Sequence, residues 1–214
     1  MATASGCGGS LRVCSERRWT RAAVLALTLA LAAAPSWAQE TRDAAGFAAW
    51  REAHPAPVAA FQKFLEEAGV GQLVELHELL RSASDWQVCD DQPYAVPPPE
   101  HWPAAARVLQ LLKELRAAGV LGRIEVHSTY RNPRLNACAG GAERSAHLRA
   151  YAIDFTPLED DDPTDRLCSF WRERGPAWDM GLGRYRSGRI HVDTAGHRSW
   201  GTDQGGRSTA CSTG

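Results

Sequence analysis

The spacing of the apolar residues changes near Gly122, and this change constrains the fold more than any other feature of the 214-residue chain. Apolar side chains recur at helical intervals from 43 to 83 and again in the amphipathic segment 102–118, with an irregular connection at 84–101. After Gly122, the segments 123–127 and 150–155 have the short alternating or apolar runs that are typical of strands. The sequence therefore predicts an α+β fold, with a small, mainly antiparallel sheet flanked by helices and a helical N-terminal part.

Three further segments complete the expected domain. Residues 132–141 are rich in Asn, Gly and Pro and predict a loop. Residues 163–174 predict a helix, and residues 185–194 predict a hairpin that turns at Ser187 and Gly188.

The first 38 residues are typical of an export signal rather than of the folded domain. Arginines at 17, 18 and 21 precede the apolar run 22–34, and small residues at 36 and 38 form a cleavage site. The run is shorter than the about 20 residues that a membrane-spanning helix needs. We therefore expect an exported protein, periplasmic or extracellular, without stable membrane insertion after signal removal. An uncleaved anchor is the alternative, and the arginine pair also permits a twin-arginine export route.

The cysteines support an oxidising destination. Removal of residues 1–38 leaves four of the six cysteines, namely Cys89, Cys138, Cys168 and Cys211. No two of them have the close spacing of a cysteine metal site. We expect two disulfide bonds, and the sequence leaves all three possible pairings open.

The charge balance limits the partners of the chain. The formal net charge is −1, from 24 Lys and Arg against 25 Asp and Glu. A nucleic-acid-binding protein needs a surplus of cationic side chains to pair with phosphates, so we expect no nucleic-acid partner. The oligomeric state stays open.

The C-terminal half contains more polar chemistry than a core requires. Asp154 lies inside an apolar predicted strand, where a carboxylate is costly to bury unless it is paired, hydrogen-bonded or bound to a metal. His147 precedes it, and His191 lies on the second strand of the predicted hairpin. A His, Asp, His set would leave one tetrahedral position of Zn²⁺ open for a catalytic water. The alternative is that hydrogen bonds satisfy each group separately.

These motifs also resemble a known family. The run 128–154, STYRNPRLNACAGGAERSAHLRAYAID, is similar to zinc D-Ala-D-Ala carboxypeptidases of peptidase family M15, with their S-x-Y-R and S-x-H-x₆-D patterns. The segment 181–201 resembles the closing part of that family, which has H-x-H or H-x-D on a strand. The resemblance implies Zn²⁺ held by His147, Asp154 and His191, with a peptidoglycan peptide as substrate. It also implies a zinc peptidase-like catalytic region at 120–214, on which we expect the helical region 39–119 to pack.

The same patterns suggest roles for the neighbouring residues. Arg131 is a candidate clamp for a substrate carboxylate, because a guanidinium makes two parallel hydrogen bonds to that group. Ser128, Tyr130 and Ser145 are expected to contact substrate or to support the ligands. Zn²⁺ at this set would lower the pKa of a bound water and polarise the scissile carbonyl.

The general base is the open question. Gly188 stands where better-matching members of the family have Glu or Asp, three residues before the last His. Asp193 is the nearest substitute, either as a catalytic base or as a residue that orients a neighbour; Glu143 and Asp179 are more remote candidates. The sequence therefore predicts a zinc metallopeptidase of the D,D-carboxypeptidase or endopeptidase type. The alternative is a non-catalytic zinc-containing peptidoglycan-binding module.

Overall fold

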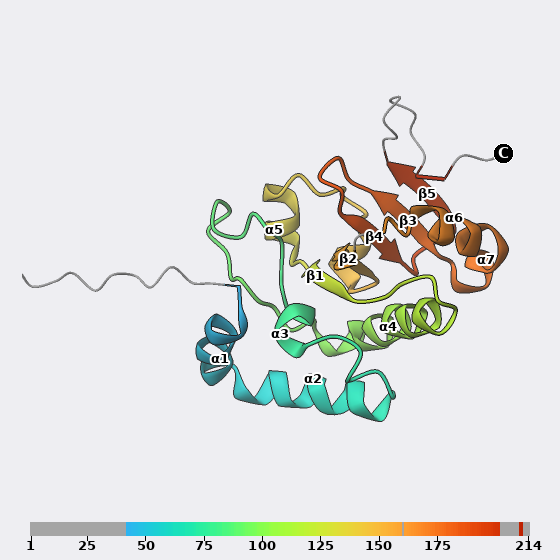
Figure 1. Ribbon diagram of the computed structural model, residues 1–214. Coiled ribbons are helices and arrows are strands. Elements are labelled where there is room, and N and C mark those ends of the chain that lie inside the picture. The colour runs from blue at the N-terminus through green and yellow to red at the C-terminus, as the bar shows by residue number, and fades with distance from the viewer. Residues whose placement is uncertain (1–41, 160, 202–209, 212–214) are drawn as a thin grey trace, which may run out of the picture. The chain divides into compact units, whose positions relative to one another are not determined.

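The computed structural model describes residues 42–159, 161–201 and 210–211 (Figure 1). All of these residues belong to one compact unit. The predicted export signal, residues 1–38, lies outside the described residues. Within the described part, none of the helices has the length and apolar character needed to cross a membrane.

The N-terminal part of the unit is helical, as the apolar spacing predicts. Helix α1 begins after Asp43, whose carboxylate caps it by accepting a 2.9 Å hydrogen bond from the Gly46 amide. A proline at the first position of the next helix lacks the amide hydrogen that would be unsatisfied there. The elements of this part are α1 (Ala44–Ala53), α2 (Pro55–Glu67), α3 (Leu76–Leu79), the 3₁₀ helix η1 (Pro99–His101) and α4 (Trp102–Ala117).

The C-terminal part is built on one five-stranded sheet of order β1-β2-β4-β3-β5. All neighbouring strands are antiparallel except β3 and β5, which are parallel. This architecture confirms the predicted α+β fold with a mainly antiparallel sheet. The strands are β1 (Ile124–Ser128), β2 (Ala152–Pro157), β3 (Gly181–Arg184), β4 (Ile190–Asp193) and β5 (Arg198–Gly201). The helices around them are α5 (Pro133–Cys138), the 3₁₀ helix η2 (Ala146–Arg149), α6 (Thr164–Glu173) and α7 (Gly175–Trp178).

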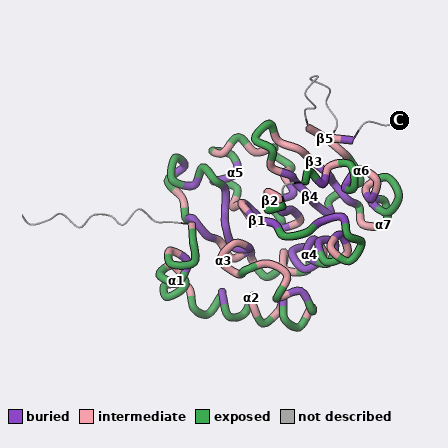
Figure 2. Tube along the Cα trace, in the orientation of Figure 1, coloured by how far each residue is buried: buried purple, intermediate pink, exposed green. Residues whose placement is uncertain are grey.

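One hydrophobic core contains residues of both parts. Helix α4 packs against the sheet through β2, and it contributes the fully buried Leu109, Leu111 and Leu115 to this core. From the sheet, Val126 and Phe155 join the same cluster. Figure 2 shows the buried residues in purple along α4 and the strands that it meets. The sheet is thereby fixed on a packed helical layer.

The turn and the second strand of the predicted hairpin are confirmed, but its first strand, β3, lies at Gly181–Arg184, before the predicted start at 185. The Gly188 amide donates a 3.0 Å hydrogen bond to the Tyr185 carbonyl, and Gly188 has the left-handed φ of 86° that a glycine tolerates best. This turn sets the register in which Gly183 lies opposite His191.

The predicted loop at 132–141 is partly wrong, because α5 lies inside it. Asn132 caps this helix by accepting a 2.8 Å hydrogen bond from the Leu135 amide, and Pro133 occupies the first helical position. Leu135 then packs into a small second core beside Trp86 and Cys89. The short helix is therefore stabilised by its cap and by tertiary packing.

Both expected disulfides are present, and the structure supplies their pairing. Cys89 is bonded to Cys138, and Cys168 is bonded to Cys211. The first bond ties the irregular connection before α4 to the end of α5. The second ties α6 to the C-terminal segment.

Candidate metal centre

Three predicted site residues meet on adjacent elements. Asp154 of β2 and His191 of β4 are direct partners in the antiparallel register, so their side chains leave the sheet at one place. His147 lies on η2, and Ala150 ends this 3₁₀ helix with a left-handed φ of 58° before β2 begins. That sharp turn brings the imidazole of His147 back toward the middle of β2. All three residues are buried.

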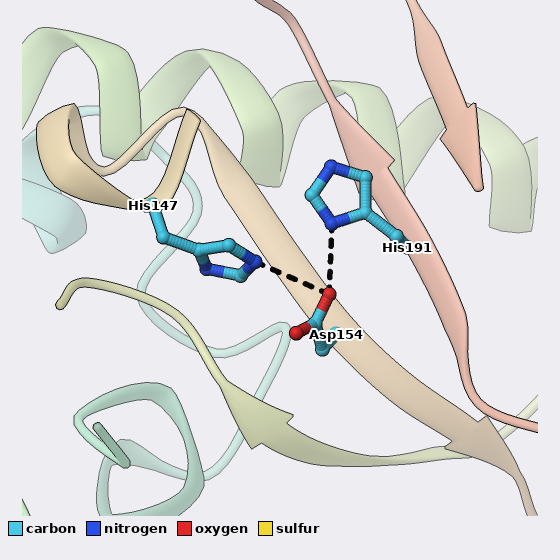
Figure 3. A group of neighbouring side chains, drawn as sticks. All are labelled: His147, Asp154 and His191. Atoms are coloured by element: carbon cyan, nitrogen blue, oxygen red, sulfur yellow. Dashed lines mark hydrogen bonds and ion pairs between the residues drawn. The ribbon is translucent and has the colours of Figure 1, made fainter. Parts of the chain in front are cut away.

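The three side chains converge on one point (Figure 3). Oδ1 of Asp154 lies 2.8 Å from Nδ1 of His191 and 3.2 Å from Nε2 of His147. One ligand atom from each residue lies within 4.8 Å of the other two. Ligands about 2.1 Å from a tetrahedral zinc ion are about 3.4 Å apart. The spacing is therefore close to what a single ion needs.

His147 presents an unsatisfied nitrogen to this point. Its Nδ1 is hydrogen-bonded to the backbone carbonyl of Thr129, so Nδ1 carries the proton and Nε2 keeps its lone pair. Nε2 is buried and has no hydrogen-bond partner among the described residues. Burial lowers the pKa of His147, which favours the neutral form that a metal requires. A buried nitrogen that makes no hydrogen bond but lies 3.2 Å from a carboxylate oxygen fits a metal ligand set.

His191 lies between two carboxylates. Its Nδ1 faces Asp154, while its Nε2 is 2.8 Å from Oδ2 of Asp193. Burial by itself lowers the pKa of His191, but hydrogen bonds to Asp154 and Asp193 raise it to about 9. In the metal-free protein, this imidazole therefore carries a proton at neutral pH.

Asp154 is held as a carboxylate. Burial favours its neutral form, but the interactions with His147 and His191 outweigh burial and keep the pKa of Asp154 well below its usual value. Its other oxygen, Oδ2, accepts a 2.5 Å hydrogen bond from Nη2 of Arg131. Asp154 is thus ionised and oriented, as a metal ligand has to be.

Asp193, one of the predicted catalytic residues, has no free acceptor position. Its two oxygens accept from His191, from the Ala195 amide and from both terminal nitrogens of Arg198, at 2.7–3.0 Å. These bonds fill the roughly four lone-pair sites of a carboxylate. Asp193 is also completely buried and does not line the cleft beside the three converging residues. Gly181 allows this placement, because a Cβ there would lie 2.2 Å from Oδ2 of Asp193.

Arg131 and Ser128 lie directly behind Asp154. Nε of Arg131 donates a 2.8 Å hydrogen bond to Oγ of Ser128, which is paired with Asp154 in the strand register. Two of the three guanidinium nitrogens of Arg131 are therefore engaged within the protein. This geometry supports the carboxylate, and Nη1 remains for other contacts.

His147 and His191 line a cleft with a volume of about 490 Å³, and Asp154 lies behind them, outside the lining. The cleft brings in Arg131 and Ser145 from the predicted set. It also brings in Trp200, which the sequence offers as a groove-lining residue or a core residue, and Tyr185 and Arg198, which sequence reasoning missed. Among the described residues, no Asp or Glu is part of its lining. Tyr130 is not brought to the cleft, because its ring packs against the hydrophobic core. Of the remote candidates for a base, Glu143 does not line the cleft, and Asp179 is paired with Arg107 at 3.1 Å.

Tyr185 and Trp200 close one side of the site. The hydroxyl of Tyr185 lies 3.2 and 3.3 Å from the two oxygens of Asp154. Burial and the nearby Asp154 carboxylate raise the pKa of Tyr185, so this hydroxyl remains a proton donor. The indole of Trp200 lies over Gly183, where a Cβ would approach within 2.2 Å of the ring. A sequence signal existed for Gly183, since a glycine inside a strand often marks a close approach.

The fold and the converging residues define a candidate metallohydrolase centre, in which two imidazoles line a cleft and one carboxylate lies directly behind them. The family model described as Peptidase M15 matches residues 73–193, more than half of the chain. The chain therefore belongs to the peptidase M15 family, whose members are metallopeptidases. No curated protein and no solved structure gives a significant match.

Proposed function

We propose that this protein is an exported zinc metallopeptidase that hydrolyses peptidoglycan stem peptides, of the D,D-carboxypeptidase or endopeptidase type. The main support is the buried Nε2 of His147, which accepts and donates no hydrogen bond within the described residues and lies 3.2 Å from Oδ1 of Asp154, beside His191. Membership of the M15 family supports the peptidase activity. The two disulfides are compatible with an oxidising compartment.

In this proposal His147, Asp154 and His191 hold Zn²⁺, which suits a tetrahedral set of two nitrogens and one oxygen. When bound, the ion would lower the pKa of a water molecule and polarise a peptide carbonyl. Two neighbours fix the imidazoles: the Thr129 carbonyl holds the tautomer of His147, and Asp193 accepts from His191. Such partners orient ligands and raise their basicity. We assign Asp193 this positioning role, because its oxygens have no capacity left for a proton from water.

The remaining residues of the cleft act on the peptide. Tyr185 supplies a protonated hydroxyl beside Asp154 that can donate to a peptide oxygen. Ser145 lines the cleft while its Oγ accepts from the His147 amide, so it can both support the ligand and meet substrate. Ser128 acts through Arg131 and Asp154. We further propose that the helical region 39–119 serves as the packing layer for the catalytic region 120–214.

One observation favours a second candidate function. Among the described residues, no carboxylate lines the cleft, and Gly188 occupies the position where the resembling proteins have one. Without a general base the protein would bind zinc and wall peptides without cleaving them. The second candidate is therefore a non-catalytic peptidoglycan-binding module.

Digestion of muropeptides distinguishes the two candidates. The purified protein would be incubated with muropeptides, with and without a zinc chelator, and the products weighed by mass spectrometry. Loss of a terminal D-alanine indicates a carboxypeptidase, and opening of cross-linked dimers indicates an endopeptidase. Both activities should stop with chelator. Bound zinc together with unchanged muropeptide masses would reject the enzyme and support the binding module.

A further inference from the structure

The three arginines that line the cleft differ in how far they are already engaged. Arg131 uses Nε for Ser128 and Nη2 for Asp154. Arg198 uses both terminal nitrogens for the carboxylate of Asp193. The side chain of Arg144 is exposed, and no hydrogen bond or ion pair joins it to any part of the chain that the structure describes. Of the three, only Arg144 has its whole guanidinium free for a ligand.

We infer that Arg144 binds a carboxylate of the peptide that occupies the cleft and makes that carboxylate a requirement for efficient recognition. This inference rests on the proposed function and adds a specificity-determining residue to it. Arg131 was the sequence-based candidate for this task, but its Nε–H and one Nη2–H are already donated to Ser128 and Asp154, and Asp154 balances its charge. A two-pronged grip on a carboxylate needs two nitrogens of one guanidinium.

The charge of the cleft supports an anionic ligand. The positive charges of Arg131 and Arg198 are matched by Asp154 and Asp193, which lie behind the wall. Among the described lining residues there is no Asp or Glu to match Arg144. Arg144 is therefore the lining arginine whose charge no carboxylate among the described residues balances, which favours a substrate carboxylate over a neutral amide.

The loop that carries Arg144 is fixed at both ends. The Gly141 amide donates a 2.8 Å hydrogen bond to the Asn136 carbonyl, and Nδ2 of Asn136 donates a 3.0 Å bond to the Ala142 carbonyl. Gly141 has to be small, because a Cβ there would lie 2.2 Å from Oδ1 of Asn136. The Cys89–Cys138 disulfide anchors the helix before the loop.

On the other side, the loop leads directly into η2 and His147. The Ser145 amide donates a 3.0 Å bond to the Ala142 carbonyl, which closes a turn around Arg144. The backbone of Arg144 is thus held at a set position relative to the converging residues. When a ligand binds to a side chain on a fixed backbone, less conformational entropy is lost than when it binds to a side chain on a flexible loop.

The test compares Arg144→Gln with Arg149→Gln as a matched control. Arg149 is also exposed, but its guanidinium stacks on Tyr151, 5.4 Å from the ring centroid, and it does not line the cleft. Three forms of one stem pentapeptide serve as probes: the free acid, the C-terminal amide, and a form in which only internal carboxylates are amidated. Binding is measured by calorimetry after chelation, so that no turnover occurs, and kcat/KM is measured on the zinc-loaded protein.

We expect the unaltered protein to bind the free acid about 10- to 100-fold more tightly than one of the two amidated peptides. This is the range expected for a charge-assisted hydrogen-bonded pair. Arg144→Gln should abolish this preference without changing the zinc content, and Arg149→Gln should keep it. Arg144→Lys should retain part of it, since the charge stays and the fork is lost. Comparison of the two amidated peptides identifies whether Arg144 binds the terminal carboxylate or an internal one.

Two results would overturn the assignment: no preference for any carboxylate in the unaltered protein, or an undiminished preference in Arg144→Gln. Failure of the proposed function looks different. In that case the binding preference depends on Arg144 while no zinc-loaded sample hydrolyses any of the three peptides.

Discussion

Helix α4 and the strands β2 and β4 all place side chains in the buried interior, but the side chains that they bury differ in chemistry. The buried face of α4 is made only of Ala, Val and Leu side chains. The two strands bury Asp154, His191 and Asp193 among apolar neighbours. Apolar burial stabilises a fold directly, whereas a buried charge is destabilising unless it is paired or bound to an ion. The difference indicates that α4 serves stability and that the strands carry the function.

The largest expected effect comes from Asp154→Asn. The amide keeps the size of the side chain but loses the charge that two imidazoles and Arg131 surround. We expect zinc affinity and kcat/KM to fall by at least about 1,000-fold, because the ligand set loses its only anion. Metal analysis after dialysis against a zinc buffer measures the zinc affinity, and muropeptide turnover measures kcat/KM. Full zinc occupancy in this variant would contradict the claim that the strands supply the metal ligands while α4 supplies stability.

The next effect is the pH dependence of zinc binding. Metal-free His191 has a pKa of about 9, and zinc requires its Nδ1 without a proton. Below pH 9 each ion bound therefore displaces one proton, so affinity rises about tenfold per pH unit. Between pH 6 and pH 8 we expect a gain of about 100-fold, measured by competition with a chelating dye. An affinity that stays constant over this range would contradict the bridging of His191 by two carboxylates.

Asp193→Asn should have a smaller effect on the site. The substitution removes the charge that accepts from His191 and pairs with Arg198. Loss of such a supporting partner typically lowers metal affinity or activity by about 10- to 100-fold. A positioning role predicts that zinc affinity and turnover fall together. If turnover fell by more than about 1,000-fold while zinc affinity stayed unchanged, Asp193 would instead be a catalytic base.

The smallest effect on the site is expected from Leu109→Ala in α4. Leu109 is fully buried, and its truncation should lower the free energy of unfolding by about 2–5 kcal/mol. Chemical denaturation measures this loss. Zinc affinity of the folded protein should stay within about twofold, because Leu109 contacts the core and not the ligands. A large drop in zinc affinity would show that the two regions are coupled more closely than we infer.

Much of the fold follows from local patterns. The alternation after Gly122 predicts strands, and the turn at Ser187 and Gly188 predicts the β3–β4 hairpin. Helix α5 was missed although its start signal is present, since Asn132 and Pro133 form a cap followed by a first-turn proline. The same residue types, Asn, Gly and Pro, are also typical of loops, and the composition of 132–141 therefore favours a loop. Strand β5 was missed because its pairing with β3 is a tertiary contact.

The candidate site was predictable only in part. Spacing and family resemblance select His147, Asp154 and His191, and the structure brings these three together. Spacing does not show that Asp193 has all its acceptor positions filled, because Arg198 lies on another strand. Nor does it place Tyr185 beside Asp154, since that contact crosses from the hairpin to β2. Cross-strand contacts of this kind depend on register, which a single sequence specifies weakly.

The central claim is that one ion joins three side chains, and anomalous diffraction from crystals grown with zinc tests it directly. The account predicts one strong peak at the zinc edge, about 2.0–2.2 Å from Nε2 of His147, Oδ1 of Asp154 and Nδ1 of His191. A crystal with zinc in the solution but no peak at this point, or a peak bound by other residues, would contradict it.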